Sequence, residues 1–366
     1  MATKHARAFS PDYCVAPGET LRETLETLGL SQADLAERTG RPKKTINEII
    51  QAKAAITPET ALQFERVLGV PASLWINLEH QYRTGIARAA EREELAKHLP
   101  WMEQFPLKLM IQREWVTHKE DRVEMLREVL RFFGVASPTA WTDVWDSVRK
   151  ATAYRQAARH KQIDFGAVAA WLRQGEIEGR ARECKPFDAT KFRSALREIR
   201  GLTTTDPQVF CKRIQDLCAD AGVAVVFVPE LPRTRLFGAA RWIAPDKALI
   251  QLSLFLKRDD QLWFSFFHEA AHILLHGRRD FFVDGPNATS DQQEAEANTF
   301  ARNILITPEQ YAEFVRAADL SREAVVAFAK RIALAPGIVV GRLQHEKLLE
   351  YGRLTDLFRP LKWSSE

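Results

Sequence analysis

Hydrophobic residues in the first part of the chain recur at helical spacing, in short runs separated by glycine and proline. The first three leucines of GETLRETLETLGL fall on one helical face. The next run begins at Ser31, a typical N-cap residue, and ends at Gly40. Two further runs start with PKKT and TPET, the second being a cap followed by proline at the first helical position. This pattern predicts a group of short helices over residues 17–83, after a flexible tail over residues 1–16.

The pattern changes further along the chain. Residues 84–205 read as helical throughout and form a predicted middle region. From residue 206 a helix is followed by three runs of strand length, VAVVFVPEL, GAARWIA and KALIQLS, and then by more helices. The predicted fold class is mainly α with a small α+β domain. The chain is predicted to contain an N-terminal five-helix domain, the helical middle region, and a C-terminal domain over residues 206–350 with a short three-stranded sheet. A tail over residues 351–366 follows.

Composition adds little to this organisation. The chain has 366 residues and a formal net charge of +4, which permits nucleic-acid binding without requiring it. Its four cysteines include no CxxC pair, as expected in a reducing compartment. No signal-peptide pattern opens the chain, and no apolar run approaches the roughly 18 residues that span a bilayer. We therefore expect a soluble, cytoplasmic protein.

The run WFSFFHEAAHILLHG places two histidines and a glutamate in an otherwise apolar helix. His268 and His272 are four residues apart, so both imidazoles project from one face and could bind one metal ion. Glu269 would lie beside that ion, where it could take a proton from an attacking water. Burying these groups without partners would cost on the order of several kcal/mol, and a bound Zn²⁺ would remove that cost. The alternative is that the histidines are ordinary structural residues.

A third zinc ligand is expected from the nearby helix QQEAEANTFARNILI. Its two carboxylates, Glu294 and Glu296, cannot both face one ion, because successive helical residues turn by about 100°. Glu294 is favoured because it shares its face with small residues that let two helices approach. Glu296 stays the weaker candidate and could be a surface acid. Asn298 would lie beside Glu294 and could hydrogen-bond a ligand histidine or the glutamate.

His276 extends the histidine series by one more step of four residues. Steps of four drift by about 40° each around a helix, so this third ring would point away from the first. Gly277 follows directly, and a helix C-cap is therefore the favoured role for His276.

Residues 206–308 resemble the ImmA/IrrE family of zinc-dependent metallopeptidases, through HEAAHILLHG and EAEANTFARNILITP. The resemblance implies a minimal gluzincin-like fold in which His268, His272 and Glu294 bind zinc and Glu269 is the general base. It further implies site-specific cleavage of a protein, such as a helix-turn-helix repressor, in the control of stress or mobile-element genes.

The helices predicted at Ser31–Thr39 and Pro42–Ala52 have the size and order of a helix-turn-helix, the second being the recognition helix. A generic helical domain with a lysine-bearing solvated face is the alternative. The residues expected to contact bases or phosphates lie on these two helices and comprise Gln32, Lys43, Lys44, Thr45, Asn47, Glu48 and Gln51.

This segment resembles the HigA/VapI-type antitoxins, a branch of the Xre helix-turn-helix family. The similarity rests on the PGE start, LSQADLA, the run ITPETALQFERVLGVPASLW and the final LEHQYR. It implies a homodimer that binds a double-stranded DNA operator, often that of its own promoter. One departure is Ala52, which stands where a glycine commonly ends the recognition helix.

Together these features predict a DNA-binding transcriptional regulator that carries a zinc-dependent endopeptidase, in stress, phage or toxin–antitoxin control. The alternative is a non-catalytic repressor or antitoxin whose C-terminal domain binds zinc and a partner protein. The segment SREAVVAFAKRIALAPGIVVGRLQHEKLL is interpreted as two packed helices that complete the C-terminal domain, rather than as a second helix-turn-helix.

Overall fold

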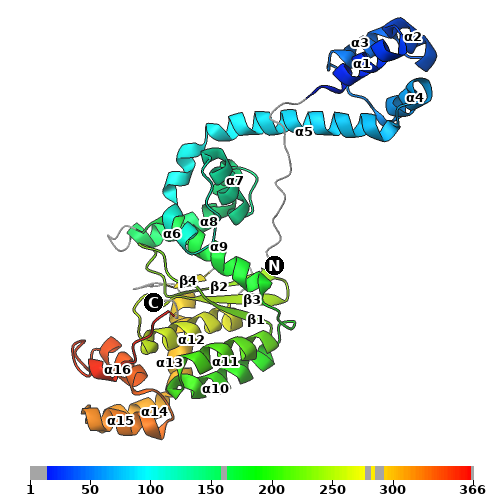
Figure 1. The fold of residues 1–366 in the computed structure, drawn as a ribbon. Helices are drawn as coiled ribbons and strands as arrows, with labels where there is room; N and C mark the ends of the chain where they lie inside the picture. Colours follow the sequence, from blue (N-terminus) through cyan, green and yellow to red (C-terminus); the bar gives the residue numbers. More distant parts are fainter. Residues whose placement is uncertain (1–14, 158–162, 277–281, 285–291, 364–366) are drawn as a thin grey trace, which may run out of the picture. The chain divides into compact units, whose positions relative to one another are not determined.

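The computed structural model describes residues 15–157, 163–276, 282–284 and 292–363. They belong to two compact units, Met1–Pro100 and Trp101–Glu366, here called unit 1 and unit 2 (Figure 1). The predicted fold class is confirmed. The domain boundaries predicted from the sequence remain predictions, and the predicted N-terminal tail lies almost wholly outside the described residues.

The described residues of unit 1 form five α-helices: α1 (Pro17–Leu28), α2 (Gln32–Thr39), α3 (Lys43–Ile50), α4 (Pro58–Leu68) and α5 (Ala72–Ala96). A short 3₁₀ turn, η1 (Leu99–Gln104), begins in this unit and ends in unit 2. The apolar faces predicted from the sequence form its core, in which Leu21, Leu35, Ile46, Phe64 and Trp75 are fully buried. Ser31 starts α2 through the predicted cap, which is reciprocal with Asp34.

Ala52, just after α3, has a positive φ of 57°. An L-residue pays on the order of 1 kcal/mol for this left-handed conformation, whereas glycine adopts it freely. We expect Ala52→Gly to stabilise unit 1 by about 0.5–1 kcal/mol, measured by urea unfolding of the full chain.

Ala33, exposed inside α2, supplies the matched control for that substitution. Ala33→Gly should destabilise unit 1 by about 0.5–1 kcal/mol, because glycine gains no conformational relief inside a helix. Destabilisation by both glycine substitutions would show that Ala52 carries no strain.

Unit 2 is a helical unit built around one small sheet. Before the sheet come α6 (Leu107–Gln112), α7 (Arg122–Phe133), α8 (Pro138–Ala157), α9 (Phe165–Ala181), α10 (Ala189–Arg200), η2 (Gly201–Thr204) and α11 (Pro207–Asp220). The strands are β1 (Val223–Phe227), β2 (Gly238–Ala244), β3 (Lys247–Leu252) and β4 (Phe282–Asp284). The remaining helices are α12 (Asp259–Leu275), α13 (Gln292–Leu305), α14 (Pro308–Arg316), α15 (Arg322–Arg331), α16 (Pro336–His345) and η3 (Thr355–Leu357).

The sheet has the order β1-β3-β2-β4, with β1 and β3 parallel and the other pairs antiparallel. All three strands predicted from the sequence are present. The fourth strand, β4, adds three residues along the start of β2, pairing Gly238 with Asp284 and Ala240 with Phe282.

Helices cover both faces of this sheet. Helix α9 lies across one face, and α11 and α12 lie on the other (Figure 1). The strand β1 is buried along almost its whole length, which is the reason for its continuous apolar run VAVVF. Trp171 of α9 donates an indole hydrogen bond to the carbonyl of Val228 at 3.0 Å, fixing that helix against the sheet. The sheet therefore forms the support on which α12 is held.

Helices α15 and α16 each contribute buried side chains to the core of unit 2. Val325 and Phe328 of α15, and Val339, Val340 and Leu343 of α16, are all buried. The two helices pack against one another and contribute to the core of unit 2, as the interpretation of two packed helices expects. Within the described residues no single helix is both long and apolar enough to cross a membrane. By length and composition alone, the pair α15 and α16, bent by 117°, passes that test together.

The start of α12 is clamped by a C-terminal segment of the chain. Asp259 Oδ1 accepts hydrogen bonds from the backbone N–H groups of Asp260 at 2.9 Å and Arg359 at 3.0 Å. Burial, together with the nearby Asp260 carboxylate, raises the pKa of Asp259 to about 6 despite these hydrogen bonds.

Because the pKa of Asp259 is higher in the fold than in the unfolded chain, the fold disfavours its ionised form. The ionised Asp259 carboxylate therefore lowers the stability of the fold above about pH 6. This loss is relieved as the pH falls from about 6 to 4 and the carboxylate is protonated. A shift of roughly two pKa units corresponds to about 3 kcal/mol.

We expect Asp259→Asn to be more stable than wild type at pH 8 by up to about 3 kcal/mol, since asparagine keeps the acceptor oxygen. The gain should shrink toward pH 4. Hydrogen exchange of the α12 amides at several pH values measures this. The control is Asp356→Asn, which changes only an exposed ion pair with Arg322. An advantage of Asp259→Asn that did not depend on pH would contradict the assignment.

Candidate metal centre and nucleic-acid interface

The candidate metal centre lies between α12 and α13, which pack along one another. One face of α12 is fixed in the core by Trp263, Phe266 and Phe267, all fully buried. The face toward α13 carries His268 and His272, each 1% exposed. Small residues of α13, Ala297 and Ala301, are fully buried and permit the close approach of the two helices.

The structure brings His268, His272 and Glu294 together, with one donor atom of each within 4.8 Å of the others. The two histidine Nε2 atoms are 3.0 Å apart. Glu294 Oε2 lies 3.2 Å from His268 Nε2, and its Oε1 lies 3.8 Å from His272 Nε2. Among the described residues, this is the group of three or more such side chains that could hold a metal ion. Of the two carboxylates that the sequence offered as third ligand, Glu294 rather than Glu296 lies beside the two histidines.

The other ring nitrogens of both histidines are also engaged. His268 Nδ1 lies 3.1 Å from the amide oxygen of Asn298, one of the two contacts predicted for that residue. His272 Nδ1 lies 2.9 Å from His276 Nδ1. Each histidine can therefore carry its proton on Nδ1 and present the lone pair of Nε2 to the cluster.

The predicted C-cap role of His276 is present: its backbone N–H donates to the carbonyl of His272 at 3.2 Å. Its side chain has a second role that the sequence did not reveal. Nε2 of His276 lies 3.2 Å from Oε2 of Glu296, on α13. Hydrogen bonds from Gln292 and from His276 lower the pKa of Glu296. Glu296 is thus connected to the cluster through two histidines rather than directly.

Glu269 is completely buried and faces the start of β2. A Cβ atom added at Gly238 would lie 2.7 Å from Glu269 Oε1 and 2.8 Å from its Cγ. A side chain at this crossing point would force the buried glutamate to shift, so the strand limits where the carboxylate can lie. This contact could not be predicted from the sequence, because it joins a strand to a helix.

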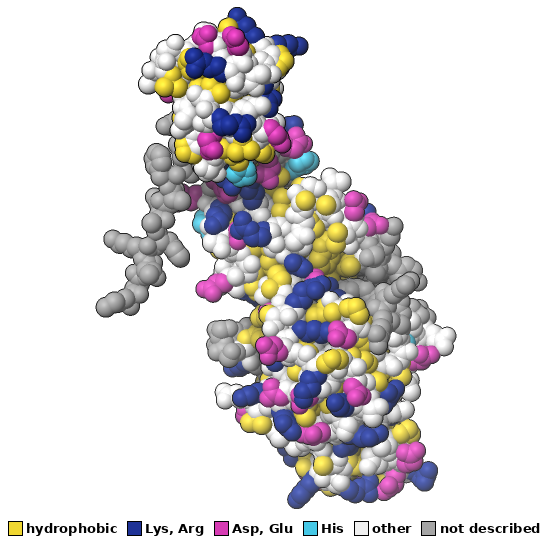
Figure 2. Space-filling view, turned by 90° about the vertical axis from the view of Figure 1, so that its right-hand side faces the viewer, with side chains coloured by type: hydrophobic (Ala, Val, Ile, Leu, Met, Phe, Trp, Pro, Cys, Tyr) yellow, Lys and Arg dark blue, Asp and Glu magenta, His cyan; other side chains and the backbone are white. Residues whose placement is uncertain are grey.

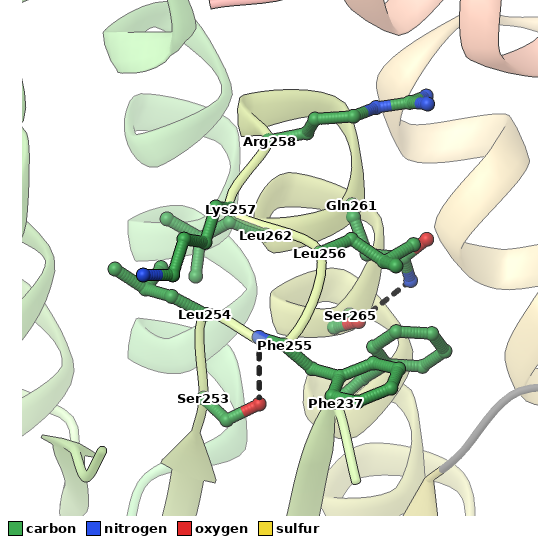
Figure 3. Close-up of a pocket in the computed structure, with 10 residues that line it drawn as sticks. All are labelled: Phe237, Ser253, Leu254, Phe255, Leu256, Lys257, Arg258, Gln261, Leu262 and Ser265. Carbon is green, nitrogen blue, oxygen red and sulfur yellow. Dashed lines mark hydrogen bonds between the residues drawn. The ribbon is translucent and has the colours of Figure 1, made fainter. Parts of the chain in front are cut away.

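A narrow hollow lies at the amino end of α12 (Figure 3). Phe237 and Phe255 form one wall, their rings packed edge to face at 5.6 Å. Across from them, Gln261 Nε2 donates to Ser265 Oγ at 3.2 Å. Gln261, Ser265 and Glu269 are spaced by four residues on α12, so the three side chains lie along one side of the helix.

The donor set fits zinc. Two imidazoles and one carboxylate, with one position left for water or substrate, are typical of catalytic zinc. Donors on one tetrahedral zinc, at about 2.0–2.1 Å from it, lie about 3.3 Å from each other. The distances of 3.0, 3.2 and 3.8 Å among these atoms are close to that value.

The candidate nucleic-acid interface is α3 with the turn before it. Helix α2 ends at Gly40, which has a φ of 67°, and α3 begins at Lys43. Ile46 and Ile49 face the core, whereas Lys43, Lys44 and Gln51 are exposed. The other predicted contact residues, Gln32, Thr45, Asn47 and Glu48, are half-buried.

Two family models match the chain, one in each unit. Residues 21–75 match the helix-turn-helix family, and residues 248–340 match the IrrE N-terminal-like domain, a peptidase family. An uncharacterised HTH-type transcriptional regulator, YddM of Escherichia coli (strain K12), is 30% identical over 66 residues, which cover 18% of this chain and 70% of that protein. The chain belongs to the helix-turn-helix family. Its second unit contains an IrrE N-terminal-like domain.

The helix-turn-helix domain has further relatives. Virulence-associated protein I of Dichelobacter nodosus is 39% identical over 69 residues, covering 19% of this chain and 64%, just under two thirds, of that protein. Among solved structures, the Pseudomonas aeruginosa antitoxin HigA with the higBA promoter is 30% identical, with a TM-score of 0.22, covering 22% of this chain and 90% of that one. The resemblance of this segment to the HigA/VapI type is shown by the match to the helix-turn-helix family and by the identity to virulence-associated protein I.

The recognition helix of the helix-turn-helix domain carries polar side chains that are already paired. Gln51 Nε2 donates to Asn47 Oδ1 at 3.2 Å, and Lys44 Nζ lies 3.8 Å from Glu48 Oε1. A further basic residue, Arg41, lies in the turn and donates to Gln63 Oε1. Sequence reasoning did not select Arg41, although it directly precedes the recognition helix.

Charge on unit 2 is distributed differently. On the face in view, Lys and Arg side chains are interspersed with Asp and Glu (Figure 2). Exposed pairs such as Arg213–Glu198 and Arg331–Glu313 are examples of this mixing.

Proposed function

We propose that this chain is a DNA-binding regulator whose second unit is a zinc-dependent endopeptidase acting on a partner protein. The observation that carries the proposal is the buried cluster of His268, His272 and Glu294. Glu269 is buried on α12, the helix that carries the two histidines. The match to the IrrE N-terminal-like peptidase family supports it.

Zinc bound by these three residues would polarise the scissile carbonyl and acidify the attacking water. Glu269 takes the proton from that water and passes it to the leaving amine. Asn298 holds His268 with Nε2 directed at the cluster, through the 3.1 Å contact to Nδ1. Gly238, at the start of β2, has no side chain and so leaves room for the carboxylate of Glu269.

The proposed substrate is a protein, such as a helix-turn-helix repressor, in stress, phage or toxin–antitoxin control. The sequence resemblance to ImmA/IrrE peptidases supports this class of substrate. An extended substrate segment could add to a free sheet edge by β-augmentation. The first residues of β2 are paired with β4 and are therefore not such a free edge.

To test the peptidase proposal, the full-length chain is purified for elemental analysis and also expressed in cells whose protein N-termini are catalogued by mass spectrometry. We expect one zinc per chain and a small set of new N-termini. His272→Ala should lose both, because it removes one ligand. Zinc without any new N-terminus would support the non-catalytic alternative, and a chain that binds no zinc would refute both.

The proposed DNA contacts are those of the recognition helix, in a homodimer bound to an operator. Lys43 and Lys44 are exposed at the start of α3, where positive charge meets phosphates. The regulator YddM belongs to the same family and supports a role in transcription.

Changing Lys43 and Lys44 together to alanine should weaken binding to all DNA sequences. The plot of log affinity against log salt concentration should also become less steep, by about 1 in the magnitude of its slope for each lysine lost. Fluorescence anisotropy at several salt concentrations measures this, with a DNA fragment selected by the wild-type chain from a random pool. Lys97→Ala, which removes an exposed charge at the end of α5, is the control. An unchanged salt slope for the double variant would exclude the two lysines from the interface.

A further inference from the structure

We infer that His276 and Glu296 form a positioning relay that holds the imidazole of His272 for metal binding. The inference rests on the proposed function, since it concerns the ligand set of that site. Three contacts carry it: His272 Nδ1 to His276 Nδ1 at 2.9 Å, His276 Nε2 to Glu296 Oε2 at 3.2 Å, and Gln292 Nε2 to Glu296 Oε1 at 2.8 Å.

Donor and acceptor roles along this chain follow from the first residue. If the Nε2 lone pair of His272 faces the metal, its proton is on Nδ1 and is donated to His276 Nδ1. A neutral His276 that accepts on Nδ1 carries its own proton on Nε2. That proton is donated to Glu296, whose carboxylate only accepts. One arrangement of protons therefore satisfies all three of these contacts.

The relay runs from a buried ligand to the surface. The side chain of His272 is 1% exposed and that of His276 is 3% exposed, whereas that of Glu296 is 45% exposed. The negative charge of Glu296 is therefore solvated and carries no burial penalty. It acts on His272 through the desolvated imidazole of His276. Histidine ligands whose second nitrogen donates toward a carboxylate bind metal more tightly and in a fixed ring orientation.

The two carboxylates of α13 thereby have different tasks. Glu294 approaches the histidine Nε2 atoms directly, while Glu296 acts from the far side through His276. The first histidine is held by a neutral amide, Asn298, and the second by a charged relay. The two ligand histidines should therefore differ in basicity, and removal of the relay should affect His272 alone.

A packing role for His276 can be separated from the relay by choice of side chain. The helix cap uses the backbone N–H of His276, so every substitution except proline retains it. His276→Phe keeps a flat ring without hydrogen bonds. His276→Gln loses the ring but keeps an acceptor for His272 and a donor for Glu296. Glu296→Gln removes only the charge at the exposed end.

The experiment measures the zinc dissociation constant of the full chain by competition with a chromophoric chelator. We expect His276→Phe to bind zinc about 10–100-fold more weakly than wild type. His276→Gln should stay within a few-fold of wild type, and Glu296→Gln should fall between these two. Glu313→Gln, which breaks an exposed ion pair with Arg331, is the control and should leave the constant unchanged.

A second measurement is the tautomer of His276 in zinc-loaded protein, read from ¹⁵N shifts and assigned by the signal lost in His276→Gln. The relay requires the proton on Nε2, and a proton on Nδ1 would overturn it. Wild-type affinity in His276→Phe, or equal losses in the Phe and Gln variants, would also overturn it. If His276→Phe does not fold, Glu296→Gln decides, because its side chain is half exposed: an unchanged constant rejects the relay. A wild-type chain without zinc affinity would instead refute the proposed function itself.

Discussion

Glu269→Gln should retain zinc and lose cleavage. The glutamine is isosteric with glutamate but cannot take the proton of the attacking water. General acid–base groups contribute about 10²–10⁴-fold to rates, and we expect a loss in that range. Because Glu269 is not among the three residues whose donor atoms converge, zinc content should stay at the wild-type level. Elemental analysis and the catalogue of new protein N-termini measure the two quantities on the same preparation.

The matched control is Glu296→Gln, the same change at a carboxylate on the neighbouring helix. It should leave cleavage measurable once zinc is supplied in excess, while Glu269→Gln should stay inactive at any zinc concentration. New N-termini at the wild-type level in cells expressing Glu269→Gln would mean that another group transfers the proton.

The parts of the fold that sequence reasoning predicted are those set by local chemistry. The three main strands follow from β-branched runs between turn residues, and β1–β3 lie where those runs are. Ser31 and Thr57 cap their helices as predicted, because capping depends on residues within one turn. The strand β4 was not predicted, because three residues carry no periodic pattern.

In the candidate metal centre, too, some features follow from local sequence and others depend on how distant helices pack. Helical phase on α12 puts His268 and His272 on one face, and helical phase on α13 separates Glu294 from Glu296. Phase alone could not decide which carboxylate reaches the histidines, since that depends on how the two helices are rotated against each other. The backbone role of His276 was local and is present, whereas its side-chain contact needed the placement of α13.

Gly238 is the position where long-range geometry matters most, and Gly238→Ala should reduce cleavage strongly without removing zinc. The new methyl group would lie 2.7 Å from Glu269 Oε1, closer than real Cβ contacts, so the buried carboxylate must move. A displacement of about 1 Å in a reacting group can cost about 10²-fold in rate. We expect kcat to fall by that order, with a much smaller change in KM, in assays on a protein whose new N-terminus has been identified.

Gly341→Ala is the control that isolates this effect. Its methyl group would also lie 2.7 Å from a carboxylate oxygen of α12, Oδ2 of Asp260, at the end of the helix away from the histidines. Both substitutions crowd an acid on one helix, so both should cost stability, but only the first touches the proposed proton carrier. If the two variants lost cleavage equally, the effect would be one of folding. If Gly238→Ala kept the wild-type kcat, Glu269 would have to act from a position that the strand does not control.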